Sequence, residues 1–325
     1  MAGGVWVVAE EKGGRLARIS AEGATLARTL AEASGVTAVG VVAGASPAGV
    51  AAELAAYVPR VLAVEVPGAA DVATAAAIAP SVAALAEREQ PAFIVLGATP
   101  DGRDLAGMLG ALLGWGVLAN AIAVAWTDGG PSVDMSILGG RFLTSSAFTG
   151  DHGILTIRSN SIAAEAAASS GVVESVTGLA PAALPAVRVT ERVDESSEAV
   201  PIEEARIIVA GGRGIGGAEG FAVVEELAHA LDGSVGATRA AVDAGWIGFS
   251  QQIGQTGKVV KPQLYVALGI SGAIQHTVGV QGAETVIAVN KDPDAPIAEF
   301  ADLFVVGDLF TVGPAIVAEL KSRGG

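Results

Sequence analysis

The second half of the sequence contains the stretch Gln251-Gln-Ile-Gly-Gln-Thr-Gly-Lys258, and a second run, Ile270-Ser-Gly-Ala-Ile-Gln-His276, follows one short apolar segment later. That segment, residues 261–268, is bounded by Pro262 and Gly269, which predicts a short buried β-strand. Both runs are rich in glycine and in polar side chains, which allow a planar polar ligand to lie close to the backbone. We therefore expect a ligand site formed by two loops that flank one strand.

The chain after residue 206 continues this alternation of strands, loops and helices. Strands are predicted over residues 206–210, 234–238, 261–268, 285–289 and 303–307. Helices are predicted over residues 218–231, from about 272, over 296–300 and over 312–321. This order predicts a compact, doubly wound α/β domain, in which ligands bind at the carboxyl ends of the strands. The residues that follow four of these strands are expected to share one edge; they are Gly212, Ser271, Asn290 and Asp308.

The first half of the chain follows a similar pattern. Apolar runs predict strands over residues 5–9, 37–43 and 91–97, and shorter alternating segments over 142–148 and 153–158 predict strands added at an edge. Alanine-rich or amphipathic stretches predict helices over residues 26–33, 48–57, 71–86 and 102–113. Alternating strands and helices imply a mostly parallel sheet that is covered by helices on both faces.

The composition changes between these two halves. Residues 181–206 are rich in proline, serine and acidic residues, and such a segment buries too little apolar surface to pack. With 325 residues, the chain is also about twice the usual domain length. We predict an N-terminal α/β domain over residues 1–190, an acidic linker over 191–205 and a C-terminal domain over 206–325. The alternative for the linker is a final surface strand.

The composition also excludes several classes of function. A net charge of −15 argues against nucleic-acid binding, which requires clustered lysine and arginine. Because the sequence has no cysteine, thiolate nucleophiles and iron–sulfur clusters are excluded, and redox chemistry would need an organic cofactor. No group of residues has metal-ligand spacing, so no metal site is expected. The apolar runs are shorter than the about 18 residues that span a bilayer, and the N-terminus lacks a basic leader, so we expect a cytoplasmic protein that is not membrane-embedded.

Two glycine-rich motifs resemble nucleotide-binding loops. Gly212-x-Gly214-x-x-Gly217 follows a predicted strand and formally matches the dinucleotide fingerprint. However, Asp232, the acid about 20 residues further on, precedes the second strand instead of ending it. The run Gly254-Gln-Thr-Gly-Lys258 is not a P-loop, since Gln252 stands where that motif needs glycine and Val259 where it needs serine or threonine.

Polar side chains in and near these loops are candidate ligand contacts. Arg213 supplies a cation for a phosphate or a flavin, unless it is only a solvated loop residue. The amides of Gln252 and Gln255 and the hydroxyl of Thr256 match the edge of a heteroaromatic ring; the alternative is a polar surface loop. His276 belongs to a predicted helix whose first turn could bind a phosphate, although a lone histidine is often structural.

Seven sequence blocks occur in the order typical of one protein family. They are Gly212-Arg-Gly214, Thr238-Arg-Ala-Ala-Val-Asp-Ala-Gly-Trp246, Gln252-Ile-Gly-Gln-Thr-Gly-Lys258, Ile270-Ser-Gly-Ala-Ile-Gln-His276, Val289-Asn-Lys-Asp-Pro293, Ala295-Pro-Ile297 and Gly307-Asp-Leu-Phe310. With these blocks the chain resembles the alpha subunit of electron-transfer flavoproteins over about residues 207–320. The first domain resembles the family through Gly97-Ala-Thr99 and Gly102-Arg-Asp-Leu-Ala106. It departs from the family at Thr238, which is more often serine, at Leu303-Phe304 and at residues 144–151.

The resemblance implies an electron carrier that does not turn over a substrate of its own. Such a subunit forms a heterodimer with the electron-transfer flavoprotein beta subunit and holds FAD mainly in its C-terminal domain. It passes electrons from dehydrogenases, such as the acyl-CoA dehydrogenases of fatty acid β-oxidation, to a quinone reductase or another acceptor. The acidic linker would let the FAD domain swing between donor and acceptor.

The resemblance also assigns roles to individual residues. It places Arg239 over the isoalloxazine ring, Thr256 near flavin N5, and His276 beside N1 and the C2 carbonyl. Because reduction puts negative charge on N1 and O2, a fixed cation or donor there raises the potential, so these three residues are candidates for redox tuning and none is expected to be catalytic. The implied cofactor-binding residues are Arg213, Thr238, Arg239, Gln252, Ile253, Gly254, Gln255, Thr256, Gly257, Ser271, Gly272, Ala273, Gln275, His276, Asn290, Lys291, Asp308 and Leu309.

Three alternatives remain open at this point. The Gly212–Gly217 loop could serve an NAD-linked dehydrogenase, which would lack flavin. A non-redox protein that binds adenine nucleotides would bind AMP or ADP as well as FAD. An electron-bifurcating flavoprotein subunit would have the same FAD site, with a second flavin in its partner.

Overall fold

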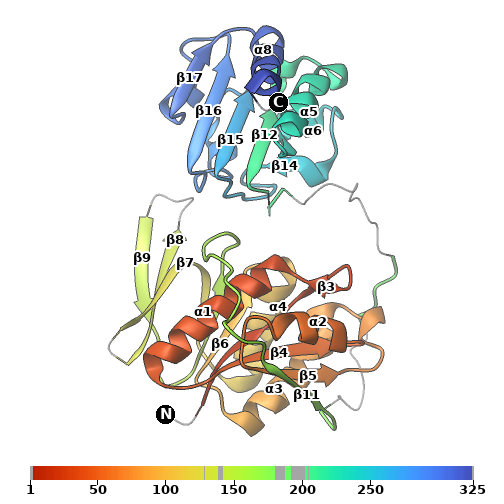
Figure 1. Cartoon of the computed structure of the whole chain (residues 1–325), viewed down its shortest axis with the longest axis vertical. Coiled ribbons are helices and arrows are strands. Elements are labelled where there is room, and N and C mark those ends of the chain that lie inside the picture. The colour runs from red at the N-terminus through yellow and green to blue at the C-terminus, as the bar shows by residue number, and fades with distance from the viewer. Residues whose placement is uncertain are drawn as a thin grey trace. The chain divides into compact units, whose positions relative to one another are not determined.

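The computed structural model describes residues 3–127, 129–137, 142–179, 187–191, 202–203 and 205–323. The chain divides into two compact units, Met1–Arg192 and Val193–Gly325. A nine-stranded sheet forms the centre of the first unit and a six-stranded sheet forms the centre of the second (Figure 1). The predicted two-domain α/β fold is confirmed.

The sheet of the first unit is parallel over most of its width. Its strand order is β11-β5-β4-β1-β6-β10-β7-β8-β9, and the first seven of these strands run parallel to their neighbours. The last three form an antiparallel meander at one edge. The bounds are β1 Val5–Val8, β4 Ala38–Gly44, β5 Arg60–Glu65, β6 Phe93–Gly97, β7 Val117–Thr127, β8 Gly130–Ile137, β9 Phe142–Ala147, β10 Gly153–Ile157 and β11 Val172–Val176, and a small hairpin joins β2 Glu11–Lys12 to β3 Arg15–Leu16.

Helices cover both faces of this sheet. Because successive side chains of a strand point to opposite faces, Val5 and Val7 pack with helices α1 and α2, whereas Trp6 and Val8 pack with α3 and α4. The bounds are α1 Arg18–Ser34, α2 Ala48–Leu54, the 3₁₀ turn η1 Ala69–Asp71, α3 Thr74–Glu89 and α4 Pro100–Leu113.

Three features of this unit differ from the sequence predictions. Residues 153–158 were expected at an edge, but β10 lies between β6 and β7 and is buried along its whole length. Its near-continuous apolar run is the pattern of a buried parallel strand, and its one polar residue, Thr156, accepts a hydrogen bond from the backbone N–H of Asn120 at 2.8 Å. The sequence did not predict β5, and α1 begins eight residues before the predicted start because its first turns bury small and polar residues.

The second unit has a fully parallel sheet with the strand order β14-β13-β12-β15-β16-β17. In chain order this is 3-2-1-4-5-6, which is the arrangement of doubly wound dinucleotide-binding folds. The strand order reverses between β12 and β15, and ligands of such folds bind outside the carboxyl ends of the strands at this reversal. The bounds are β12 Ile207–Gly211, β13 Ser234–Thr238, β14 Gln252–Ile253, β15 Leu264–Leu268, β16 Thr285–Asn290 and β17 Leu303–Val306.

The two faces of the second sheet are covered differently. Helices α5 and α8 lie over one face of the sheet (Figure 1), and they pack on alternate strand residues such as Val209 and Val266. The other face, with Ile208 and Tyr265, is covered by loops and short helical segments. The bounds of the helical segments are η2 Arg213–Ile215, η3 Ala218–Gly220, α5 Phe221–Ala230, α6 Arg239–Asp243, η4 Phe249–Gln251, α7 Ile274–Thr277, η5 Pro296–Glu299 and α8 Leu309–Arg323.

The predicted helix that starts near residue 272 is much shorter than expected. Helix α7 has four residues and begins at Ile274, whereas residues 270–273 form a loop in which Gly272 lies against Ile297. The phosphate site expected at the first turn of a longer helix is therefore not supported.

Most of the predicted linker, residues 191–205, lies outside the described residues. At its end, Ile202 and Ala205 are buried in the core of the second unit, and Glu203 forms an ion pair with Lys258. Within the described ranges, none of the helices combines the length and the apolar composition needed to cross a membrane.

Candidate functional site

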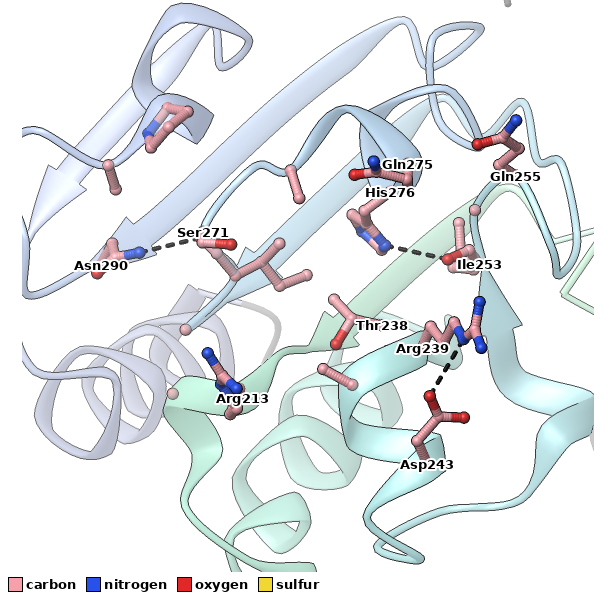
Figure 2. Close-up of a pocket in the computed structure, with 18 of the residues that line it drawn as sticks. Arg213, Thr238, Arg239, Asp243, Ile253, Gln255, Ser271, Gln275, His276 and Asn290 are labelled. Carbon is pink, nitrogen blue, oxygen red and sulfur yellow. Dashed lines mark hydrogen bonds and ion pairs between the residues drawn. The ribbon is translucent and has the colours of Figure 1, made fainter.

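A cavity of about 820 Å³ lies at the carboxyl ends of the strands in the second unit (Figure 2). Its volume is within the range of sites for small molecules and cofactors. Loops that follow β12, β13, β15 and β16 contribute to its wall, so it is located where the strand order reverses. Of the residues predicted to bind a cofactor, the structure brings these to the cavity: Arg213, Thr238, Arg239, Ile253, Gly254, Gln255, Thr256, Ser271, Ala273, Gln275, His276 and Asn290.

Six predicted site residues do not line this cavity. Gln252 and Gly272 are buried behind the loops, and Gly257 is in the turn that closes residues 252–258. Leu309 is buried at the start of α8, where Lys291 and Asp308 form a partly exposed ion pair at 3.2 Å. The carboxylate of Asp308 also accepts the backbone N–H of Phe310, and these two contacts lower its pKa.

The sequence prediction omitted eight residues that line the cavity. They are Gly214, Ala240, Asp243, Gly269, Ile270, Asp292, Ala295 and Pro296. All except Gly269 fall within the seven sequence blocks, so position in a block was the available signal. Most have small or apolar side chains, which sequence chemistry alone does not distinguish from packing residues.

The glycines of the apparent dinucleotide fingerprint have a different role from the one the motif suggests. Gly214 donates its N–H to the carbonyl of Gly269 at 2.9 Å, and a Cβ atom at Gly214 would lie 2.8 Å from the Cα of Gly269. These glycines allow the β12 and β15 loops to touch. Gly217 has open space around its Cβ position, so it does not provide the close helix–strand packing of the third fingerprint glycine. Asp232 lies in the turn before β13. The NAD-linked alternative therefore gains no structural support.

The loop over residues 252–258 is held by backbone hydrogen bonds. The N–H of Lys258 donates to the carbonyl of Gln252 at 2.7 Å, and the N–H of Gly254 donates to the carbonyl of Lys258 at 3.0 Å. The N–H of Gln255 donates to the carbonyl of Gln275 at 2.7 Å, which joins the loop to α7. Gly254 has φ of 141°, and a Cβ atom there would lie 2.7 Å from the Gln275 carbonyl oxygen, so this position requires glycine.

Two arginines line the cavity. Arg239 Nε contacts Asp243 Oδ2 at 3.1 Å, and both side chains are more than half exposed, so the pair adds little stability (Figure 2). Asp243 offsets part of the Arg239 charge while leaving the guanidinium at the cavity wall. Arg213 lies at the β12 loop and is exposed.

His276 is buried at the cavity wall, and both of its ring nitrogens have protein partners. Nδ1 lies 3.0 Å from the Ile253 carbonyl oxygen, which can only accept, so Nδ1 carries a proton (Figure 2). Burial lowers the pKa of His276 to about 4, although the bond to the Ile253 carbonyl acts in the opposite direction. The ring is therefore neutral at pH 7, and Nε2 accepts the hydroxyl of Tyr265 at 2.7 Å. In this arrangement His276 offers the cavity neither a charge nor an unused N–H.

Thr238 places a hydroxyl without a partner at the same wall. The residue is 9% exposed, and its Oγ1 atom has no hydrogen bond within the described part of the chain. A buried hydroxyl without a partner costs about 1–3 kcal/mol, and a polar ligand atom would remove this cost. Together with two arginines and the polar 252–258 loop, this donor set fits a cofactor that has both a polar ring and phosphates.

Comparison with known proteins identifies the family of this chain. Residues 5–180 match the family model described as the electron transfer flavoprotein domain, and residues 201–281 match the electron transfer flavoprotein FAD-binding domain. The electron transfer flavoprotein subunit alpha of Mycobacterium tuberculosis (strain ATCC 25618 / H37Rv) is 45% identical over 324 residues, which cover 99% of each chain. The chain belongs to the electron-transfer flavoprotein alpha-subunit family. The alpha subunit of Bacillus subtilis (strain 168) is 38% identical, over 98% of this chain and 97% of its own.

Family membership confirms three predictions from the sequence. The chain is an electron-transfer flavoprotein alpha subunit, its cofactor is FAD, and its function is electron transfer. The match to the FAD-binding domain begins at residue 201 and includes the β12, β13 and β15 loops that line the cavity.

Proposed function

We propose that this electron-transfer flavoprotein alpha subunit pairs with a beta subunit and binds FAD in the cavity of its second unit. It accepts electrons from dehydrogenases, such as acyl-CoA dehydrogenases, and passes them to a quinone reductase or another acceptor. The observation that carries the proposal is the cavity at the strand-order reversal, which is lined by Arg213, Thr238, Arg239 and Thr256.

A carrier role agrees with the titratable side chains at the cavity. An enzyme that moves protons on a substrate needs a group whose pKa lies near the working pH. The pKa of His276 is lowered to about 4 by burial, and Asp243 is paired with Arg239. His276 is therefore neutral near pH 7 and is not prepared for proton transfer there, and on this ground we propose that the protein has no substrate turnover of its own.

Specific residues would hold the cofactor. Arg239, Thr256 and the backbone at Ile253–Gly254 would contact the ring, and Thr238 would donate its unused hydroxyl hydrogen to a polar atom of FAD. Arg213 and Ser271 would serve the pyrophosphate, with Asn290 near the adenosine. FAD supplies the electron-accepting ring when it is bound. The charge of Arg239 would favour negative charge on that ring, because a fixed cation beside the ring raises the potential.

Asn290 contributes to this site mainly by holding loops together. Its Nδ2 donates to the carbonyl of Ile270 at 2.9 Å, and its Oδ1 accepts the N–H of Asp292 at 3.0 Å. Both Ile270 and Asp292 line the cavity. We therefore propose that Asn290 shapes the adenosine end of the site through these two segments.

The visible spectrum of the protein tests the proposal. The chain should be co-produced with an electron-transfer flavoprotein beta subunit and purified without added cofactor. We expect flavin absorption bands that disappear when a dehydrogenase and its substrate are added. Protein that shows no flavin bands, even after incubation with FAD, would contradict the proposal. Displacement of FAD by AMP or ADP in a competition titration would favour the nucleotide-binding alternative.

A further inference from the structure

Gln252 is a buried polar residue that lies next to the cavity but does not line it. It is 3% exposed, and its side-chain Nε2 lies 3.2 Å from Oγ1 of Thr256, which does line the cavity. A side-chain amide loses its hydration when it is buried, so its partner matters for stability and for the geometry of the loop.

Backbone contacts hold Thr256 next to the side-chain amide of Gln252. Gln252 belongs to β14, the edge strand that pairs with β13, and its carbonyl accepts the N–H of Lys258. The turn then passes so close to Gln252 that a Cβ atom at Gly257 would lie 2.4 Å from the Gln252 carbonyl oxygen. Thr256 therefore has little freedom to move away from the Gln252 amide.

The contact determines how the Thr256 hydroxyl can be used. A hydroxyl group has one hydrogen to donate and lone pairs that accept. Because the amide N–H of Gln252 donates to Oγ1, the hydroxyl acts as the acceptor in this contact and keeps its own hydrogen for another partner. Thr256 lies at the cavity wall, so that hydrogen is available to a bound ligand.

We propose that Gln252 is a positioning residue that fixes the Thr256 hydroxyl as a donor toward the cofactor. The inference rests on the proposed function, in which Thr256 contacts the ring of FAD, and on the family resemblance, which places Thr256 near N5. N5 of the oxidised ring accepts a hydrogen bond, and its negative charge increases when the ring gains one electron without a proton. The donor would therefore favour the one-electron-reduced ring, so Gln252 would raise the one-electron potential without touching FAD.

Replacement of Gln252 by glutamate reverses this contact with little change in shape. A carboxylate can only accept, so in the Gln252→Glu variant the Thr256 hydroxyl would donate to the new carboxylate and its hydrogen would turn away from the cavity. Gln252→Met removes the amide and adds no charge, which provides a second variant if the buried carboxylate impairs folding. Gln251→Glu is the matched control, because Gln251 is outside the cavity and its Oε1 already accepts the hydroxyl of Ser250 at 2.8 Å.

The test compares the affinities of FAD and 5-deaza-FAD for the apo heterodimer. The analogue has a C–H group in place of N5 and cannot accept this hydrogen bond. In the wild type we expect FAD to bind about threefold to tenfold more tightly than 5-deaza-FAD. The ratio should fall to about one in Gln252→Glu and in Thr256→Val, should fall at least partly in Gln252→Met, and should fall no further in the double variant Gln252→Glu/Thr256→Val. Gln251→Glu should keep the wild-type ratio.

Other outcomes would overturn the inference. If Thr256→Val abolishes the preference while Gln252→Glu and Gln252→Met retain it, Gln252 does not position the hydroxyl. If the wild type binds FAD with no preference over 5-deaza-FAD, the hydroxyl does not donate to N5. Failure of the wild-type heterodimer to bind either flavin would instead contradict the proposed function itself.

Discussion

The buried histidine of the cavity wall should make the stability of the protein depend on pH. His276 is 6% exposed, and burial lowers its pKa from 6.5 to about 4 in the folded protein. Between these two pH values the unfolded chain binds a proton that the folded chain does not bind. The free energy of unfolding therefore keeps its full value, as far as His276 is concerned, above pH 6.5, and it decreases progressively as the pH falls toward 4.

The size of this effect follows from the two pKa values. Integration of the proton-binding difference gives a loss of about 2 kcal/mol in the free energy of unfolding between about pH 7 and pH 5. The His276→Gln variant lacks the titrating group, so its stability should fall by about 2 kcal/mol less than that of the wild type over this range. The absolute stability of the variant should also fall, because the contacts to Tyr265 and Ile253 are disturbed.

The free energy of unfolding can be measured by urea unfolding at about pH 7, 6 and 5. The wild type and His276→Gln should each be prepared as a flavin-loaded heterodimer with the same partner subunit. His229→Gln is a suitable control because His229 is exposed on α5, away from the cavity. Its pH dependence should follow that of the wild type. If His276→Gln shows the full wild-type loss of stability over this pH range, burial does not hold His276 neutral and the reasoning is refuted.

Three further predictions concern the FAD loop and the segment between the two units. Thr256→Val should retain FAD but lower its one-electron potential by about 60 mV, from the loss of a hydrogen bond to a charged group, and spectroelectrochemical titration would show an unchanged potential if the hydroxyl has no role. Gly254→Ala should weaken FAD binding about tenfold to a hundredfold, since φ of 141° and the close Gln275 carbonyl strain any side chain there; fluorescence titration would detect this, and wild-type affinity would contradict it. Deletion within residues 191–201 should slow electron transfer from a reduced dehydrogenase while FAD stays bound, and an unchanged stopped-flow rate would exclude a swinging FAD domain.

The sequence predicted the second unit well because its strands are short apolar runs followed by glycine-rich loops. It did not give the position of β10 in the first sheet, because hydrophobic pattern reports burial and says nothing about neighbours. Strand β14 was missed because Gln252 and Ile253 are too few residues to show a period, and they pair with β13 only through the folded backbone.

The composition of the site was predictable, but its hydrogen bonds were not. Gln252 and Gln255 are chemically identical in the sequence, yet the first is buried beneath Thr256 and the second is exposed at the cavity. The partner of His276 is Tyr265, eleven residues earlier on a buried strand, and only the folded sheet brings their side chains together. The resemblance of the sequence blocks therefore identified most of the residues around the cavity, and tertiary contacts decide how each of them can act.

The most direct test of the central claim is to block the cavity and measure bound FAD. Ala273 lines the cavity and is exposed, so Ala273→Trp would fill space that the cofactor needs, whereas Ala222→Trp places the same side chain on the exposed surface of α5. We predict that the purified Ala273→Trp heterodimer contains little FAD by visible absorbance and that Ala222→Trp contains as much as the wild type. Full FAD content in a folded Ala273→Trp heterodimer would show that FAD binds elsewhere.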